Sequence, residues 1–258
     1  MTREAVTPEE PLPDPAVQVA GAREIAADLL VIPNQRVGLV PNIGVIGGDR
    51  AVLVVETGIG TANAEQVLAC ASELARGRLF RGLGEPIADR LEGVPVPTPD
   101  LVYDAGYDLD LGGRTVRLRS TGRGHTKGDQ VVEVPDAGVL FTGDLAETGQ
   151  FAIFPWFPPY DTDVSGVRWL AVLDRLAATD RRVVVPGHGD IGGPQALADV
   201  RDHLRELRDE TWRRRDFAMG EDEIVTEVRA LLIDRHPEWT GQEWIERGVG
   251  CLCAEHTA

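Results

Sequence analysis

The sequence is poor in cysteine and lacks long apolar runs, and each shortage excludes a class of protein. It contains three cysteines in 258 residues, and its first fifteen residues are acidic and proline-rich, without the apolar segment of a secretory signal. No apolar run approaches the length that a membrane-spanning helix needs. We therefore expect a cytoplasmic protein with reduced thiols and no membrane partner.

Positive charge is also scarce. Lysine and arginine total 26 against 42 aspartates and glutamates, which gives a formal net charge of −16. Such a surplus of negative charge repels phosphate backbones and anionic lipids, so nucleic acid is excluded as a partner. The hydrophobic fraction of 43% is that of an ordinary soluble protein whose chain is long enough to bury a large core.

The hydrophobic pattern alternates between strand-like and helix-like segments. Short apolar runs at 28–33, 37–41, 43–48 and 51–56 predict an antiparallel meander, and a helical pattern follows over 61–77. Strands are then expected within 107–144, a helix over 164–178, a strand over 182–187, and helices from Pro194 onwards. This order predicts a layered α/β (α+β) fold, which we divide into a disordered tail (1–15), a main domain (16–193) and a helical extension packed on the same domain (194–258).

Three polar residues occupy the same kind of place, directly after an apolar strand and among glycines. They are His125 in "GRGHTKGD", Asp144 in "VLFTGDLAE" and His188 in "VVVPGHGD". Strand ends of a layered sheet can converge, and two imidazoles with one carboxylate suit zinc, or iron in a facial triad. Each residue alone has an ordinary role in a turn, but their coincidence favours a metal site.

These motifs, together with "VGLVPNIGVIGGDRAVLVVETGIG", resemble the metallo-β-lactamase superfamily over about residues 20–193. The resemblance implies a four-layer αββα sandwich and metal-dependent hydrolysis. It also implies that His125 binds the first metal ion, that Asp144 bridges the two ions and takes the catalytic role, and that His188 binds the second ion.

The H-x-H-x-D-H motif of this superfamily is missing. It is expected after the first helix and the next strand, but no histidine precedes residue 125, and "ELARG" passes directly to "RLFRGLG". We infer that one strand, the motif loop and the following helix are lacking. Three ligand residues remain, the protein ligand count of one catalytic zinc, so we expect one zinc ion rather than two, weak metal affinity and poor activity, with iron as an alternative.

Two neighbouring features complete the predicted site. Phe154, Trp156 and Phe157, in an aromatic and proline-rich segment, either form a wall against the substrate or fill the core. Asp129 either accepts a hydrogen bond that fixes the tautomer of His125 or caps its own turn.

The remaining histidines and cysteines receive structural interpretations. His203 and His236 are expected at the surface. The C-terminal C-x-C-x-x-H pattern, from Cys251 to His256, is interpreted as packing and not as a metal site, because no second ligand pair is present.

Three functional hypotheses follow. The first is a metal-dependent hydrolase acting on a small ester, thioester, lactone or lactam, impaired or restricted to one metal ion. The second is a non-catalytic protein of the same fold that binds a ligand or a partner. The third is a mono-iron protein that uses the two histidines and one carboxylate.

Overall fold

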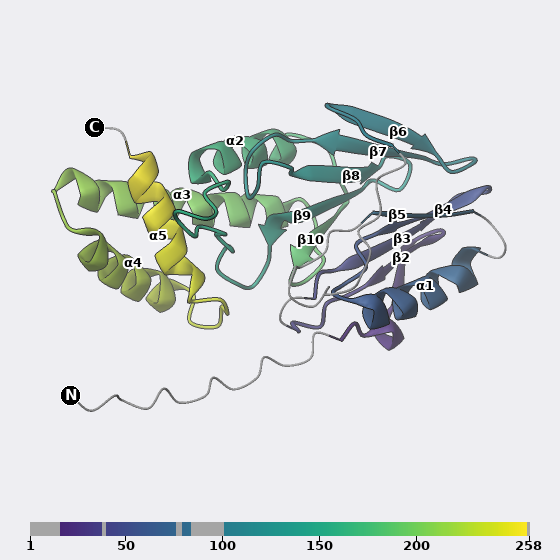
Figure 1. The fold of residues 1–258 in the computed structure, drawn as a ribbon, viewed down its shortest axis with the longest axis horizontal. Helices are drawn as coiled ribbons and strands as arrows, with labels where there is room; N and C mark the ends of the chain where they lie inside the picture. Colours follow the sequence, from purple (N-terminus) through teal and green to yellow (C-terminus); the bar gives the residue numbers. More distant parts are fainter. Residues whose placement is uncertain (1–15, 38–39, 76–78, 84–100, 257–258) are drawn as a thin grey trace.

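A computed structural model describes residues 16–37, 40–75, 79–83 and 101–256 (Figure 1). The predicted tail, residues 1–15, lies outside the described residues. The first sheet contains, in spatial order, β1 (Arg23–Ala26), β2 (Leu29–Ile32), β3 (Ile43–Gly47), β4 (Ala51–Val55) and β5 (Leu79–Leu83). The second contains β10 (Val183–His188), β9 (Val139–Glu147), β8 (Gln130–Val134), β7 (Thr115–Ser120) and β6 (Gly106–Asp110). The helices are a short 3-10 turn, η1 (Val19–Gly21), and α1 (Thr61–Ala75), α2 (Gly166–Ala177), α3 (Gln195–Asp216), α4 (Glu221–Arg235) and α5 (Trp244–Glu255).

Apolar side chains on both faces of each sheet create the layers. In β4, Val52 and Val54 face the cluster that contains residues of α1, whereas Leu53 faces the cluster between the two sheets. In β9, Phe141 points into that middle cluster and Leu140 into the cluster beneath the C-terminal helices. Successive side chains of a strand point to opposite faces, so strands that are apolar throughout need cover on both sides. The predicted four-layer αββα architecture is confirmed.

Parts of the element prediction are wrong. Val37, Val40 and Pro41, from the expected strand at 37–41, lie in no strand, and β1 was not expected. Residues 79–83, where we expected no strand, form β5, which pairs in parallel with β4 from Ala51↔Leu79 to Val55↔Leu83. Parallel strands need a crossover connection, and α1 supplies it between β4 and β5. The strand is therefore defined by pairing with a distant segment, which the local apolar pattern does not indicate. The missing motif and the helix after it would fall in residues 84–100, which lie outside the described residues and contain no histidine.

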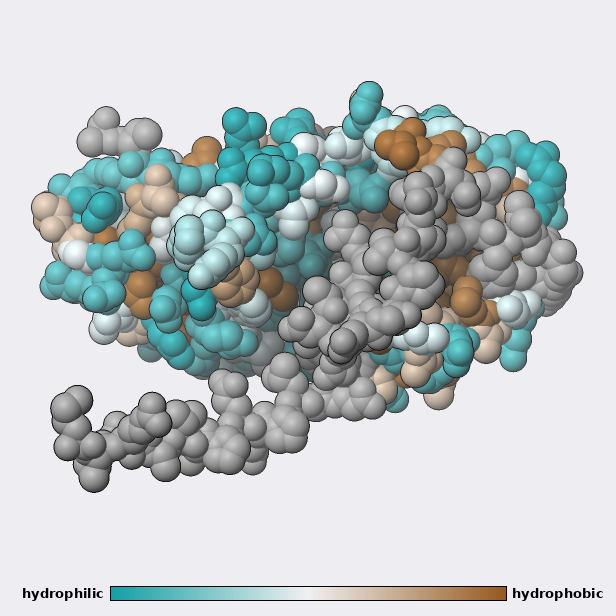
Figure 2. Space-filling view, viewed as in Figure 1, coloured by the Kyte–Doolittle hydropathy of each residue, from teal (hydrophilic) through white to brown (hydrophobic). Residues whose placement is uncertain are grey.

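Helices α2 and α3 cover the outer face of the second sheet, and α4 and α5 pack on α3 at the end of the molecule away from the first sheet (Figure 1). Leu204 of α3, Val228 of α4 and Val249 of α5 belong to the same buried cluster as Leu140 of β9. These helices therefore share a core with the sheet. On the face seen in Figure 2, hydrophilic side chains predominate at this end of the molecule. Among the described residues, no helix is long and apolar enough to cross a membrane.

The histidines and cysteines of the C-terminal helices differ in burial. His203 is buried and His236 is half-buried, so the expectation that both lie at the surface is wrong. Phe151, His236 and Trp239, which all lie outside α3, pack against the ring of His203, so the apolar stripe of α3 alone does not mark its burial. Cys251 and Cys253 are buried free thiols of α5, as the packing interpretation requires, and His256 contacts Asp216 at 2.9 Å.

Candidate metal centre

The irregular pairing of β9 with β10 positions two acidic side chains at the end of the second sheet. Gly143 pairs with Pro186 and Glu147 with His188, so β9 uses four steps where β10 uses two. Bulges of this kind re-aim side chains, and Gly143 adopts the positive φ of 52° within this stretch. Asp144 and Glu147 would face opposite sides of a regular strand, but here both reach one cluster.

His125 enters the same cluster from the loop between β7 and β8. A hydrogen bond from the backbone N–H of Gly124 to the carbonyl of Thr126, at 3.0 Å, closes the turn around it. Its ring lies edge-on to Trp169 of α2, with ring centroids 5.4 Å apart, and the indole N–H of Trp169 donates to the carbonyl of Leu145 of β9 at 3.0 Å. The imidazole is therefore held between α2 and β9.

One ligand atom each from His125, Asp144 and Glu147 lies within 4.8 Å of the other two. His125 Nε2 and Glu147 Oε1 are buried, and neither has a hydrogen-bond partner among the described residues. Such unsatisfied atoms each cost about 1–3 kcal/mol, and a divalent cation in this position would satisfy both.

Glu147 is the buried acid of this cluster. Its second oxygen, Oε2, accepts a hydrogen bond from the backbone N–H of Ile153 at 2.7 Å. Burial, and next the charge of Asp144, raise the pKa of Glu147 well above its usual value. The side chain of Asp144 is 36% exposed, so it is the member of the set that meets solvent.

His188 lies beside Asp144, with its Nε2 3.5 Å from Oδ1 of the carboxylate. Among the described residues it is not a member of either set of three whose ligand atoms all lie within 4.8 Å. The structure thus brings His125 and Asp144 together, places His188 next to Asp144, and adds Glu147, which sequence reasoning missed. Glu147 belongs to the motif "FTGDLAE", but only the bulge between β9 and β10 shows that its side chain points to the same cluster as Asp144.

Asp129 holds the loop of His125 rather than its ring. Oδ1 accepts hydrogen bonds from the backbone N–H and the hydroxyl of Thr126, at 2.9 and 2.6 Å, as in the turn-capping alternative. Its Oδ2 is buried without a hydrogen-bond partner among the described residues. Burial raises the pKa of Asp129 despite these hydrogen bonds and the nearby His125.

The three aromatic candidates lie in different environments. Phe154 has no exposed surface and packs against Trp169 with ring centroids 5.2 Å apart, so the core alternative describes it. Trp156 is partly buried against the same core. Phe157 is 40% exposed, and the guanidinium of Arg247 lies over its ring at 4.8 Å. Within the described chain, Phe157 is therefore the most accessible of the three.

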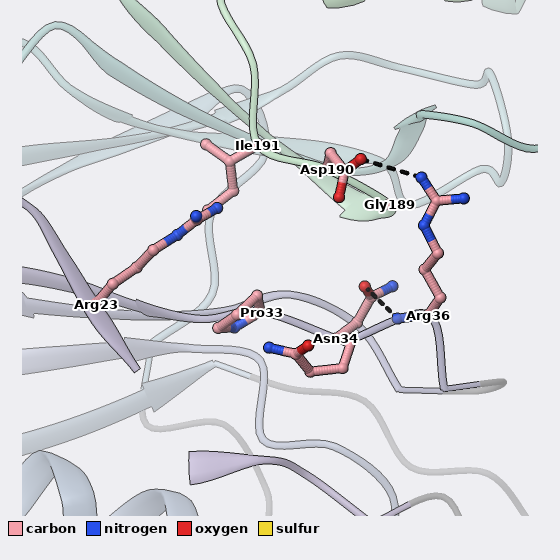
Figure 3. A pocket seen from close by; sticks show the side chains of 8 residues that line it. Arg23, Pro33, Asn34, Arg36, Gly189, Asp190 and Ile191 are labelled. Carbon is pink, nitrogen blue, oxygen red and sulfur yellow. Dashed lines mark hydrogen bonds and ion pairs between the residues drawn. The ribbon is translucent and has the colours of Figure 1, made fainter. Parts of the chain in front are cut away.

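A cavity of about 250 Å³ opens beside the loop that follows His188 (Figure 3). Gly189 and Asp190 line it on one side, and Arg23 and Arg36 approach from the first sheet and the loop after β2. Arg36 pairs with Asp190 at 3.0 Å, while no ion pair of Arg23 is found within the described residues. The backbone of Arg36 has a φ of +58°, which is uncommon for a residue with a side chain.

The fold and this cluster together define a structural class of protein. Its members are αββα sandwiches with imidazole and carboxylate groups gathered at the strand ends of one sheet. Residues 73–188 match the family described as "Metallo-beta-lactamase superfamily". A curated relative, "Metallo-beta-lactamase type 2" of Bacteroides fragilis, is 27% identical over 118 residues, which are 45% of this chain and 46% of that protein. The family match covers residues 73–188, and the chain spans less than half of this relative's length.

Solved structures share the architecture at lower identity. The DIM-1 metallo-beta-lactamase superposes with a TM-score of 0.58 at 16% identity, covering 74% of this chain and 98% of its own. The metallo-beta-lactamase from Pontibacter korlensis gives 0.54 at 18% identity, covering 71% and 98%. These similarities establish the fold.

Proposed function

We propose that the chain is a metal-dependent hydrolase that holds one zinc ion with His125, Asp144 and Glu147. Two observations carry the proposal. His125 and Glu147 each bury a ligand atom, Nε2 and Oε1, without a hydrogen-bond partner among the described residues. His125, Asp144 and Glu147 each offer one ligand atom within 4.8 Å of the other two. Imidazole and carboxylate groups are both established zinc ligands. Three protein ligands correspond to a catalytic zinc that keeps one position for water.

Each residue of the centre has a distinct task in this proposal. His125, Asp144 and Glu147 would hold the zinc ion, which would supply a water of lowered pKa, about 7, and so hydroxide near neutral pH. Asp144 faces solvent and is placed to accept a proton from the attacking water. His188, whose Nε2 lies 3.5 Å from Oδ1 of Asp144, orients that carboxylate. Trp169 excludes water from the inner side of the His125 ring.

The substrate that fits best is a small ester, thioester, lactone or lactam with an anionic group. Arg23 and Arg36 border the cavity next to Gly189, one residue after His188. Guanidinium groups bind carboxylates and phosphates with paired hydrogen bonds. Because the chain carries a net charge of −16, this local positive charge is distinctive. The prediction of Phe154, Trp156 and Phe157 as the substrate wall is therefore replaced by a proposal for this arginine-lined cavity.

Metal analysis and hydrolysis assays on the full chain test the proposal. After chelation and reloading with zinc or iron, the chain is expected to retain zinc and to hydrolyse members of an ester, thioester, lactone and lactam panel. His125→Ala and Glu147→Gln are expected to lose the hydrolytic activity and the zinc equivalent bound at this centre, whereas His256→Gln, a histidine remote in the fold, retains both. Zinc binding without turnover of any panel member would refute the hydrolase and favour a binding protein. Retention of iron in preference to zinc would favour the mono-iron alternative.

Substrate charge is tested separately. Arg23→Gln is expected to raise KM for a carboxylate-bearing ester and to leave an uncharged ester of the same size unaffected. Equal effects on both esters would contradict an anion-binding role for this cavity.

A further inference from the structure

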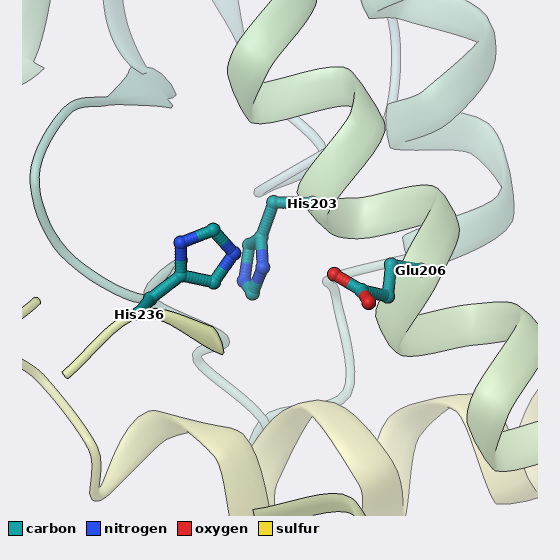
Figure 4. A group of neighbouring side chains, drawn as sticks. All are labelled: His203, Glu206 and His236. Carbon is teal, nitrogen blue, oxygen red and sulfur yellow. The ribbon is translucent and has the colours of Figure 1, made fainter. Parts of the chain in front are cut away.

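A second group of metal-ligating side chains lies among the C-terminal helices, apart from the centre at β9. His203 and Glu206 stand three residues apart on α3, so they share one face of the helix. His236 follows the last residue of α4 and approaches the same place (Figure 4). A ligand atom from each residue lies within 4.8 Å of the other two.

His203 is the buried member of this group. It is 5% exposed, and its Nδ1 has no hydrogen-bond partner among the described residues. Its ring is packed against those of Phe151 and Trp239, with centroid distances of 5.5 and 5.2 Å. Burial, and next the neighbouring His236, lower the pKa of His203 to about 3, so the imidazole is neutral near pH 7. A neutral imidazole keeps a free lone pair, which is the form that binds a metal ion.

The other two members are accessible and fixed by neighbours. The ring of His236 stacks on Trp239, with centroids 4.0 Å apart and an interplanar angle of 21°. Glu206 forms an ion pair with Arg235, the last residue of α4. Trp239 therefore supports the imidazole of His236, and the guanidinium of Arg235 competes with a metal ion for the carboxylate of Glu206.

A cavity of about 420 Å³ adjoins the three residues and gives them access to solvent. Two aspartates of α3 also line this cavity: Asp199, one helical turn before His203, and Asp202, which directly precedes His203. Asp202 is paired with Arg201 and Arg205, whereas Asp199 accepts a hydrogen bond from Gln195 at 2.8 Å. The acidic lining raises the local concentration of cations at the entrance.

We propose that His203, Glu206 and His236 form a second site for a divalent transition metal ion, with zinc as the ion that fits best. Two imidazoles and one carboxylate are a ligand set that zinc uses in sites with an open fourth position. The adjoining cavity leaves that position free for water or a small anionic ligand. The bound ion links α3 to the end of α4 and satisfies the buried nitrogen of His203. The site requires nothing from the centre at β9, so the two can be tested independently.

Zinc titration of the full-length, metal-free chain tests the site. Calorimetry with zinc alone, and absorption spectra with cobalt in its place, report stoichiometry without any substrate. The wild-type chain is expected to bind one more equivalent than Glu206→Gln and His236→Gln. Both variants change accessible side chains, and circular dichroism confirms that they remain folded. His256→Gln is the matched control and is expected to retain the full stoichiometry.

Two further variants separate this site from the proposed catalytic one. Glu147→Gln is expected to remove the equivalent bound at β9 and to retain the equivalent bound at His203. Arg235→Gln frees Glu206 from its ion pair, so zinc is expected to bind this site more tightly, an effect that a merely structural role for the three residues would not produce. Equal stoichiometry in wild type, Glu206→Gln and His236→Gln would overturn the proposal whatever happens at β9.

Discussion

Replacing Glu147 with glutamine is expected to change the thermal stability of the chain in opposite directions with and without metal. In the metal-free chain, Glu147 is fully buried next to Asp144 and its Oε1 has no hydrogen-bond partner among the described residues. Glutamine keeps an acceptor for the backbone N–H of Ile153, removes the buried acid beside Asp144 and brings an amide donor into the cluster that contains the unpartnered Nε2 of His125. Relief of one unsatisfied buried group is worth about 1–3 kcal/mol.

These energies convert to measurable shifts in Tm. For a chain of this size each kcal/mol shifts Tm by about 2–4 °C, so metal-free Glu147→Gln is expected to melt about 2–12 °C above the wild type. Zinc at a hundredfold excess over its Kd stabilises the site that binds it by about 2.7 kcal/mol. The wild type gains this increment and the variant lacks it, so the advantage of the variant shrinks or reverses when zinc is added.

Differential scanning calorimetry with excess chelator and then with zinc measures both differences. Glu65→Gln, on the exposed face of α1, is the control and is expected to change stability by less than about 0.5 kcal/mol in either condition. A lower Tm for metal-free Glu147→Gln, together with equal zinc increments in both chains, would refute the assignment of Glu147 as a ligand.

Three further predictions follow from the packing. Phe154→Ala removes a side chain with no exposed surface and is expected to cost about 3–5 kcal/mol in chemical denaturation, whereas Phe157→Ala costs far less; similar losses would contradict the core placement. Gly187→Ala puts a methyl group 2.1 Å from Oδ1 of Asp144, so zinc affinity measured by calorimetry is expected to fall, and unchanged affinity would argue against Asp144 as a ligand. Burial raises the pKa of all three thiols, and Cys251 and Cys253 of α5 are buried whereas Cys70 is half-buried. A thiol reagent at pH 8 is therefore expected to modify Cys70 first and the other two only on unfolding. Simultaneous modification of all three in the native chain would contradict this.

The layered fold could be predicted from the sequence because its signals are local. The apolar run of β4 is buried on both faces, and the stripe of α3 at Leu197, Val200 and Leu204 faces the core as expected. β5 was missed because its identity depends on parallel pairing with β4, which joins residues across α1. The inferred loss of a whole strand–loop–helix segment therefore does not hold for the strand.

The candidate site divides in the same way. His125, Asp144 and His188 were recognised because each comes after apolar residues in a glycine-containing segment, which is a pattern of neighbouring residues. The structure places only His125 in a loop, because Asp144 lies within β9 and His188 ends β10. Glu147 was not recognised, because strand periodicity places it opposite Asp144 and a bulge against β10 reverses that. Similarly, His203 lies off the apolar stripe of its own helix and is buried only by the packing of other segments around it.

The sequence by itself determined most of the order of strands and helices (β1 and β5 excepted), the acidic character of the chain and the three glycine-containing segments that carry His125, Asp144 and His188. Only the tertiary structure decided that Glu147 joins two of these residues and that His203, Glu206 and His236 meet. The physical reason is that turn chemistry and hydrophobic periodicity act over a few residues, whereas bulge register and helix packing are set by contacts between distant segments.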